Sequence, residues 1–321
     1  MVESDAVSSA LALEHVTKRY GGFAAVDDLN LEVPTGRITG FLGPNGAGKT
    51  TTIRMIMSII YPDSGAIRVL GHDSALSVKD RIGYLPEERG LYRKMTVEHT
   101  LRYFGRLKGM RGDALQRRIE QQLERVGLRD WLRKPVESLS KGMQQKLQFI
   151  STILHDPDLV ILDEPFSGLD PLNMELLKDL LLELRDAGKT VIFSTHQMDQ
   201  AQRLCDRLVL INRGRKLVSG TLEEIRSGFS ARIVTLEGDG DFAPLAAHSG
   251  VVEAQILEDR ARFELDDEAD ANELLRRATE LGRITKFEIQ RPDLHEIFVK
   301  LVEQDAVGRT PAEPVAQEAA V

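Results

Sequence analysis

One run of eight residues, Gly43-Pro44-Asn45-Gly46-Ala47-Gly48-Lys49-Thr50, constrains the fold of this chain more than any other feature. It matches G-x-x-x-x-G-K-[ST], the pattern of a phosphate-binding P-loop between a strand and a helix. The apolar run at 38–42 precedes it and predicts a strand. Residues 51–60 follow it, are mostly apolar and contain no Gly or Pro, so they predict a helix. The motif therefore stands in the strand–loop–helix context that it requires.

The residue types of this loop suit an anion. Its three glycines allow the backbone to curl so that N–H groups point inward, and the following helix N-terminus adds partial positive charge. The motif assigns Lys49 to the β- and γ-phosphates of a nucleotide and the Thr50 hydroxyl to Mg²⁺. We therefore expect nucleotide contacts from residues 43–50 and from Thr51.

Length and composition indicate an ordinary globular protein. The 321 residues suffice for two domains, and 42% hydrophobic with 29% charged residues argues against wholesale disorder. A net charge of −8 disfavours nucleic acid as a partner. The single cysteine cannot form an internal disulfide. Neither a membrane-spanning stretch nor a secretory signal is evident, so we expect a cytoplasmic protein whose membrane role comes through a partner.

The order of predicted elements indicates an α/β fold. Strands alternate with helices, which implies a parallel sheet covered on both faces. The predicted strands lie at 11–13, 37–42, 64–71, 159–162 and 190–194, and the predicted helices at 97–131 with a break at 108–112, 143–155 and 172–187. We expect this first domain to span 11–225, with a helical subdomain at about 88–155 and a disordered N-terminus at 1–10.

A second, smaller α+β domain is predicted at 231–303. Its elements follow a βαββαβ order, as in ferredoxin-like folds: strand 231–236, helix 243–248, hairpin strands 252–257 and 260–265 around Glu258-Asp259, helix 270–281 and strand 284–289. Pro292 is expected in the first turn of a last helix that ends near Glu303, and 304–321 are expected to be disordered. This domain is either a ligand- or ion-sensing module or a dimerisation or packing module, and we favour the latter.

Two acids follow a buried strand at Val160-Ile161-Leu162-Asp163-Glu164-Pro165. The strand delivers them to its carboxyl end, where open α/β sheets bind ligands. Asp163 can hold Mg²⁺, directly or through its water shell, and Glu164 can act as a general base toward an attacking water. The alternative is a solvated acidic turn, which the P-loop upstream disfavours.

The run Leu139-Ser140-Lys141-Gly142-Met143 precedes a predicted helix. With the motifs above, it resembles the Leu-Ser-Gly-Gly-Gln signature of the nucleotide-binding subunits of ATP-binding cassette (ABC) transporters. Ser140 and Gly142 match this signature, whereas Lys141 and Met143 depart from it. A hydroxyl at a helix N-terminus and a glycine beside it let a phosphate approach the backbone. A plain helix N-cap is the alternative for the serine.

Further motifs appear in the order of that family. The run Ser167-Gly168-Leu169-Asp170 resembles the loop that crosses the dimer interface, which places Asp170 near nucleotide. His196 resembles the family's switch histidine and could donate a hydrogen bond to the γ-phosphate, although a lone histidine at a strand end is more often structural. Tyr20 stands where the family keeps an aromatic that stacks on adenine, with an ordinary turn tyrosine as the alternative.

The run Ile82-Gly83-Tyr84-Leu85-Pro86-Glu87 departs from the family pattern. It resembles the loop that normally carries a glutamine linking Mg²⁺ to the transmembrane partner, and Glu87 stands in its place. The carboxylate keeps an oxygen for the metal but adds negative charge near the γ-phosphate, and the net sign of this effect is open. The resemblance thus implies Thr50, Glu87 and Asp163 as metal ligands.

The resemblance spans residues 11 to about 225 and implies a P-loop NTPase cassette: a parallel core sheet with helices, an antiparallel β part and a helical subdomain. The run at 87–92, the altered signature and the extra C-terminal domain resemble the branch of sodium-extrusion and drug-export ATPase subunits, which pair with separate permeases. The resemblance implies ATP and Mg²⁺ as cofactors. It also implies a peripheral location on the cytoplasmic face of the cell membrane and a dimer, either of this chain or with a related cassette.

In the mechanism that this resemblance implies, two ATP are clasped between two cassettes. Lys49 and His196 stabilise the transferring phosphoryl group, Glu164 orients the water, and opening of the dimer drives export of an ion, drug or other small solute. The alternative is a soluble ABC ATPase acting on the ribosome or DNA. Such proteins usually carry two cassettes or a long coiled-coil insertion, whereas this chain has one cassette and no sustained heptads.

Overall fold

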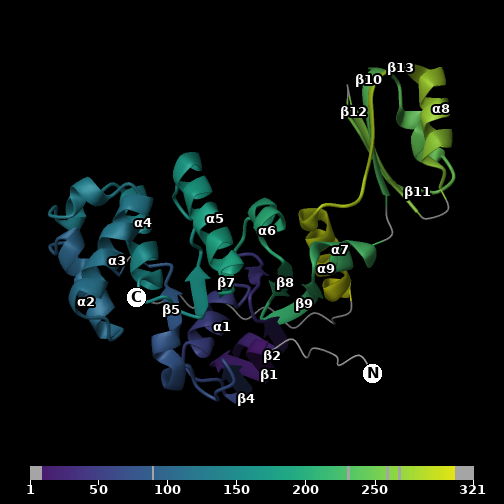
Figure 1. Ribbon diagram of the computed structural model, residues 1–321. Coiled ribbons are helices and arrows are strands. Elements are labelled where there is room, and N and C mark those ends of the chain that lie inside the picture. Colours follow the sequence, from purple (N-terminus) through teal and green to yellow (C-terminus); the bar gives the residue numbers. More distant parts are fainter. Residues whose placement is uncertain (1–8, 89, 230–231, 258–259, 267–268, 308–321) are drawn as a thin grey trace, which may run out of the picture. The chain divides into compact units, whose positions relative to one another are not determined.

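The computed structural model describes residues 9–88, 90–229, 232–257, 260–266 and 269–307 (Figure 1). The chain divides into two compact units, 1–221 and 222–321, and each is described by itself. The domain limits given above, 11–225 and 231–303, stay predictions. In the described part of the chain, no helix has the length and apolar character needed to span a bilayer.

A six-stranded sheet forms the centre of the first unit (Figure 1), in the order β5-β6-β7-β3-β8-β9. The first five strands run parallel, and β9 runs antiparallel to β8. Strands β3, β6 and β7 are buried along their whole length, which explains their unbroken apolar sequences. The strands are β3 Ile38–Leu42, β5 Ile82–Leu85, β6 Leu159–Asp163, β7 Thr190–Thr195, β8 Arg207–Asn212 and β9 Arg215–Gly220. Of these, β5, β8 and β9 lie outside the strands predicted from the sequence.

A three-stranded antiparallel sheet, in the order β2-β1-β4, completes the β structure of this unit. Its strands are β1 Ser9–Tyr20, β2 Phe23–Pro34 and β4 Ser64–Val69. The expected disorder of 1–10 is wrong for its last two residues, since Ser9 pairs with Pro34 and Ala10 is fully buried. Residues 9 and 10 are ordered because Ser9 pairs with β2 and Ala10 is buried against the sheet. Residues 1–8 lie outside the described part.

Helices cover the central sheet and build the helical part of the first unit (Figure 1). They are α1 Lys49–Ile56, α2 Val97–Leu107, α3 Gly112–Arg125, α4 Lys141–Ile153, α5 Pro171–Asp186 and α6 Met198–Leu204, with 3-10 turns η1 Ala75–Arg81, η2 Arg129–Trp131 and η3 Val136–Ser138. The predicted break at 108–112 is confirmed, with Gly109 in the left-handed region. Helix α1 ends four residues before the predicted Ile60, because Ser58 adopts a left-handed φ of 55° that no α-helix accommodates.

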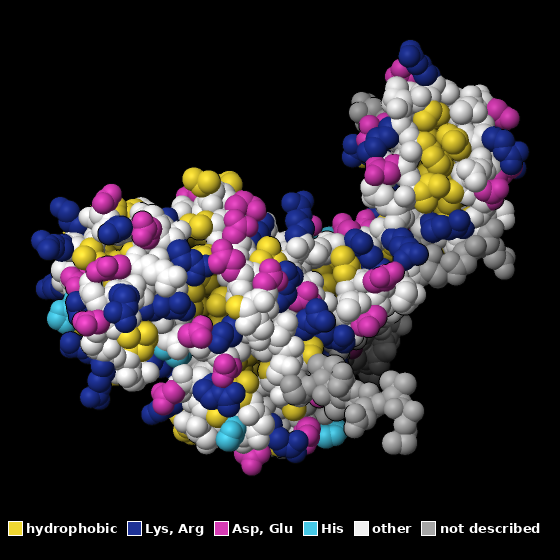
Figure 2. Space-filling view, in the orientation of Figure 1, with side chains coloured by type: hydrophobic (Ala, Val, Ile, Leu, Met, Phe, Trp, Pro, Cys, Tyr) yellow, Lys and Arg dark blue, Asp and Glu magenta, His cyan; other side chains and the backbone are white. Residues whose placement is uncertain are grey.

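The second unit contains a four-stranded antiparallel sheet in the order β11-β12-β10-β13. This is the ferredoxin-like order predicted from the βαββαβ sequence pattern. Phe263 on β12 is a fully buried member of its hydrophobic core, and Figure 2 shows hydrophobic side chains on the face of this unit beside α8. The elements are α7 Leu222–Ser227, β10 Arg232–Gly240, η4 Ala243–Ala247, β11 Val251–Ile256, β12 Arg260–Leu265, α8 Ala271–Leu281, β13 Gly282–Gln290 and α9 Leu294–Val307. The predicted turn at Glu258-Asp259 lies outside the described residues.

The last helix differs from its prediction at both ends. Pro292 precedes α9 instead of lying in its first turn. The start is set by a reciprocal cap, because Glu296 N–H donates to Asp293 Oδ1 and Asp293 N–H donates to Glu296 Oε2, both at 2.8 Å. The helix continues to Val307, so the expected disorder of 304–307 is wrong, since no Gly or Pro interrupts the helix before Gly308. The rest of that tail lies outside the described residues.

Candidate functional site

The P-loop connects the carboxyl end of β3 to α1, and its glycines are required by close backbone approaches. Gly48 has a φ of 102°, and a Cβ there would lie 2.5 Å from Ala25 O. A Cβ on Gly43 would lie 2.2 Å from Ile211 O. Both positions therefore exclude any larger residue, and the neighbouring strands β2 and β8 impose the loop's shape.

Lys49 is held over this loop by the loop's own backbone. Its Nζ donates to the carbonyls of Gly43 at 2.8 Å and Pro44 at 3.1 Å, and lies 3.7 Å from Glu164 Oε1. Burial lowers the pKa of Lys49, an effect opposed by the nearby carboxylates of Glu164, Asp163 and Glu87. The Lys49 ammonium is thus partly desolvated and close to three carboxylates, and its attraction to negative charge is stronger there than in water.

Strand β6 delivers Asp163 to the same edge of the sheet, with 1% of the residue exposed. Its Oδ1 accepts hydrogen bonds from Thr50 Oγ1 at 3.3 Å and Ser194 Oγ at 2.5 Å. Its Oδ2 is buried and has no hydrogen-bond partner among the described residues. A buried carboxylate oxygen beside a threonine hydroxyl is a hard oxygen donor set of the kind that Mg²⁺ prefers.

Glu164 follows Asp163 with its backbone in the left-handed region, at a φ of 49°. This conformation costs a non-glycine residue about 1–2 kcal/mol. Two hydrogen bonds hold it: Ser167 N–H donates to Glu164 O at 3.1 Å, and Glu164 N–H donates to Ser194 Oγ at 3.0 Å. The Glu164 carboxylate meets His196 Nδ1 at 3.1 Å, so the strained turn directs this side chain toward the histidine that follows β7.

A cavity of about 400 Å³ lies over the P-loop and Glu164, whereas Asp163 and His196 are not among the residues that line it. The predicted Tyr20, Lys49, Thr50, Thr51, Glu87 and Glu164 all line it, as do most residues of the loop. Phe23 also lines it and was missed by the sequence reasoning. It pairs with Tyr20 across the β1–β2 turn, and the two rings are 62% and 52% exposed. The available signal was a second aromatic just after Gly21-Gly22.

Three predicted site residues lie away from this cavity and beside one another. Ser140 Oγ accepts from Met143 N–H at 3.2 Å and caps α4, while Asp170 Oδ1 accepts from Asn173 N–H at 2.9 Å and caps α5. A Cβ on Gly142 would lie 3.1 Å from Asn173 Nδ2. The hydrogen bonds from Asn173 lower the pKa of Asp170. The signature serine and glycine thus form a group with the start of α5.

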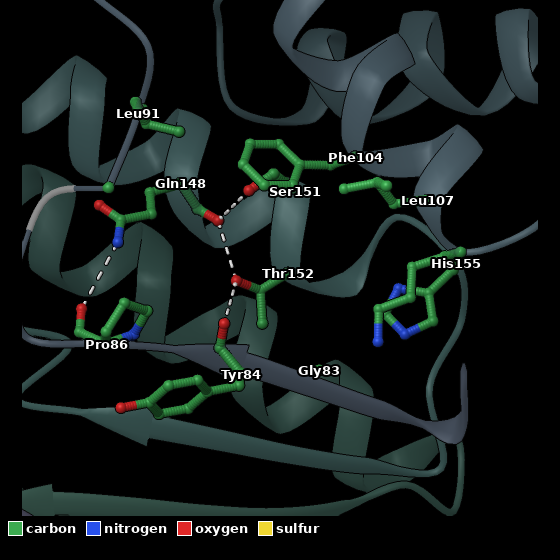
Figure 3. A pocket seen from close by; sticks show the side chains of 12 residues that line it. Gly83, Tyr84, Pro86, Leu91, Phe104, Leu107, Gln148, Ser151, Thr152 and His155 are labelled. Carbon is green, nitrogen blue, oxygen red and sulfur yellow. Dashed lines mark hydrogen bonds between the residues drawn. The ribbon is translucent and has the colours of Figure 1, made fainter. Parts of the chain in front are cut away.

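A second cavity, of about 210 Å³, lies between α2, α4 and the segment that follows β5 (Figure 3). Figure 3 shows Gln148 and Thr152 of α4 reaching the backbone of Pro86 and Tyr84, at 3.4 Å in both cases. Phe104 and Leu107 line the cavity from α2. These hydrogen bonds tie α4 to the turn that carries Glu87 into the first cavity.

His155, just past α4, lines this second cavity as a neutral group. Burial and the nearby charge of Lys108 lower the pKa of His155 to about 4. Its Nε2 lies 3.2 Å from Ile82 O, to which Lys108 Nζ also donates at 2.9 Å. His155 Nε2 and Lys108 Nζ are therefore engaged with β5, whereas His155 Nδ1 is buried and has no hydrogen-bond partner among the described residues. Apolar side chains from α2 form the opposite wall.

The strand–loop–helix at the edge of a parallel sheet, with two acids on the adjoining strand, defines a P-loop nucleoside triphosphatase. Residues 26–167 match the family model described as ABC transporter, and residues 220–302 match that described as ATP-binding protein DrrA1-3-like, C-terminal domain. The chain belongs to the ATP-binding proteins of ABC transporters, a family of ATPases. The family predicted from the sequence motifs is thereby confirmed.

Individual relatives and a solved structure support the same family assignment. The uncharacterized ABC transporter ATP-binding protein YhaQ of Bacillus subtilis (strain 168) is 43% identical over 292 residues, covering 91% of this chain and 98% of the relative. The ABC transporter ATP-binding protein NatA of the same organism is 41% identical over 205 residues, covering 63% and 83%. The Nod factor export ATP-binding protein I of Cupriavidus metallidurans (strain ATCC 43123 / DSM 2839 / NBRC 102507 / CH34) is 38% identical, covering 73% and 78%. A solved ATP-binding subunit of an ABC transporter superposes with a TM-score of 0.65 at 33% identity, covering 69% and 93%.

Proposed function

We propose that this ATPase is the motor subunit of an exporter. In this proposal it pairs with itself or with a related cassette, binds two ATP between the pair, and drives a separate membrane permease from the cytoplasmic face. The convergence of Lys49, Asp163, Glu164 and His196 at one sheet edge carries the proposal. Similarity to proteins named for Nod factor export supports an exported cargo, for which we propose an ion, a drug or another small solute.

Mg²⁺ is the metal that the site residues fit. Thr50 Oγ1 and the unpartnered Oδ2 of Asp163 would hold it, and Glu87, which lines the same cavity, offers another oxygen. When bound, the ion neutralises charge on the β- and γ-phosphate oxygens. Within the described ranges no cluster of three His, Cys, Asp or Glu forms a metal site, so phosphate and water would complete the coordination.

The remaining groups have separate roles in the proposed hydrolysis. Lys49 offers its charge to the phosphates, and His196 donates toward the γ-phosphate. Glu164, oriented by its strained backbone and by His196, accepts a proton from the attacking water. Tyr20 and Phe23 offer ring faces for the base at the open end of the cavity.

The position of the signature residues supports a pair of cassettes. Ser140, Gly142 and Asp170 do not line the cavity of their own chain, yet Ser140 and Gly142 form a helix N-terminus suited to a phosphate. We assign these residues to the nucleotide held by the partner cassette. Closure of the pair would exclude water and strengthen every electrostatic contact with the phosphates.

For the permease we assign the second cavity as the contact surface. Its apolar wall on α2 can receive side chains of the permease, and its other wall is bonded to the Pro86–Glu87 turn. A displacement at this cavity would therefore reach Glu87 in the ATP site. In this proposal, the hydrogen bonds between α4 and residues 84–88 connect the permease contact to Glu87, and all of these residues belong to the first unit.

Purification from membranes in mild detergent tests this proposal. A multi-span permease is expected to copurify, and Leu107→Arg is expected to reduce its yield at least tenfold while ATP binding is unchanged. Leu107 is 61% exposed, and Leu257→Arg, at a 65% exposed leucine of the second unit, is the matched control. Copurification of ribosomal proteins in place of a permease would contradict the proposal.

A further inference from the structure

Ser194 stands at the end of β7, directly beside Asp163 in the parallel register of β6 and β7. Side chains of paired residues on neighbouring strands point to the same face of a sheet. Ser194 is completely buried, and its hydroxyl contacts both Asp163, the last residue of β6, and Glu164, which follows that strand. It lies two residues before His196, and the sequence motifs assign a role to His196 but none to Ser194.

The hydroxyl makes two different hydrogen bonds at once. Its O–H donates a hydrogen bond to Asp163 Oδ1 at 2.5 Å, and its oxygen accepts a hydrogen bond from Glu164 N–H at 3.0 Å. A hydroxyl can do both because it carries one proton and two lone pairs. The first bond is the shorter of the two that Oδ1 accepts, since Thr50 Oγ1 donates to the same oxygen at 3.3 Å, and Oδ2 of the buried carboxylate has no partner among the described residues.

We propose that Ser194 is a positioning residue that orients both the carboxylate of Asp163 toward the metal and the backbone of Glu164 toward the water. The first bond selects which oxygen of Asp163 is free for Mg²⁺. The second supports the left-handed turn that directs Glu164 toward His196. This inference rests on the roles proposed above for Asp163 and Glu164.

Removal of this hydroxyl should therefore weaken metal binding as well as turnover. Partners that orient a metal ligand typically contribute 10- to 100-fold in metal affinity or activity. Ser194→Ala is expected to lower kcat at saturating Mg²⁺ and to raise the Mg²⁺ concentration for half-maximal ATPase activity about tenfold. Binding of metal-free ATP should stay unchanged, because Ser194 does not line the nucleotide cavity.

Thr39→Val is the matched control. Thr39 is a buried hydroxyl on the adjacent strand β3, 1% exposed, and its Oγ1 has no hydrogen-bond partner among the described residues. Its removal changes the same sheet without breaking a bond, so metal affinity and turnover are expected to stay at the wild-type level. A metal defect in Thr39→Val equal to that of Ser194→Ala would overturn the assignment.

The decisive readout is Mn²⁺ binding to the full chain with ATP, followed by electron paramagnetic resonance. A Glu164→Gln background prevents consumption of ATP. Adding Ser194→Ala should lower the affinity for Mn²⁺ about tenfold. Ser194→Cys keeps the shape of the side chain but forms only weak hydrogen bonds, so it should lower the affinity by the same factor and serves as the test if the alanine variant is unstable. Wild-type Mn²⁺ affinity in the cysteine variant would overturn the role of Ser194. Full turnover by Glu164→Gln alone would instead overturn the proposed function.

Discussion

Replacement of Glu164 by Gln isolates the charge of the proposed general base. Gln keeps the size of the side chain and one oxygen that can meet His196 Nδ1, which lies 3.1 Å from the carboxylate. What is lost is the ability to take a proton. General-base catalysis typically contributes about 10²–10⁴-fold, which corresponds to about 3–5 kcal/mol on the activation barrier. We expect ATP turnover to fall by this factor.

Binding should respond in the opposite direction. The Glu164 carboxylate lies 3.7 Å from Lys49 Nζ, so it competes with phosphate for the same ammonium and repels the phosphate itself. Glu164→Gln removes both effects, and we expect ATP affinity that is equal or higher and a dimer that persists in ATP.

Single-turnover phosphate release measures the rate of the Glu164→Gln variant, and light scattering after size exclusion measures its dimer. Glu183→Gln, at a surface residue paired with Arg125, is the matched control and should behave as wild type. If Glu164→Gln released phosphate at the wild-type rate, the base role would be refuted. Full-rate hydrolysis by a monomer prevented from pairing would refute the two-cassette arrangement.

Two further predictions concern packing in the two units. Gly40→Ala places a Cβ 2.6 Å from Cys205 Sγ, so we expect a loss of about 1–3 kcal/mol in the free energy of unfolding. Urea denaturation measures this loss, and most of it should be recovered in Gly40→Ala/Cys205→Ala; additive losses would contradict the clash. Phe263→Ala removes a fully buried ring from the second unit and should cost about 3–5 kcal/mol. Hydrogen exchange of the full chain should then accelerate in β10–β12, and unchanged protection there would contradict the assigned core.

Much of the site could be predicted from the sequence because its motifs are local. The P-loop needs a strand, closely spaced glycines and a helix within about twenty residues, and the acids at 163–164 follow directly on an apolar strand. The break in the helical segment and the βαββαβ order of the second unit were also predicted from periodicity and turn residues. These features depend on short-range backbone preferences and on the spacing of apolar side chains.

The tertiary structure alone decided which of these segments meet. Nothing in the local sequence indicates that Ser194 lies beside Asp163, because their contact depends on the parallel pairing of β6 and β7 across 31 residues. Phe23 reaches the cavity over the P-loop only through the β1–β2 hairpin, and Ala10 becomes ordered only through its burial. Parallel sheets bring residues together through crossover connections, so the free energy of these contacts comes from packing between distant segments. The sequence by itself therefore determined which chemical groups the site contains, and the folded sheet determined their distances and partners.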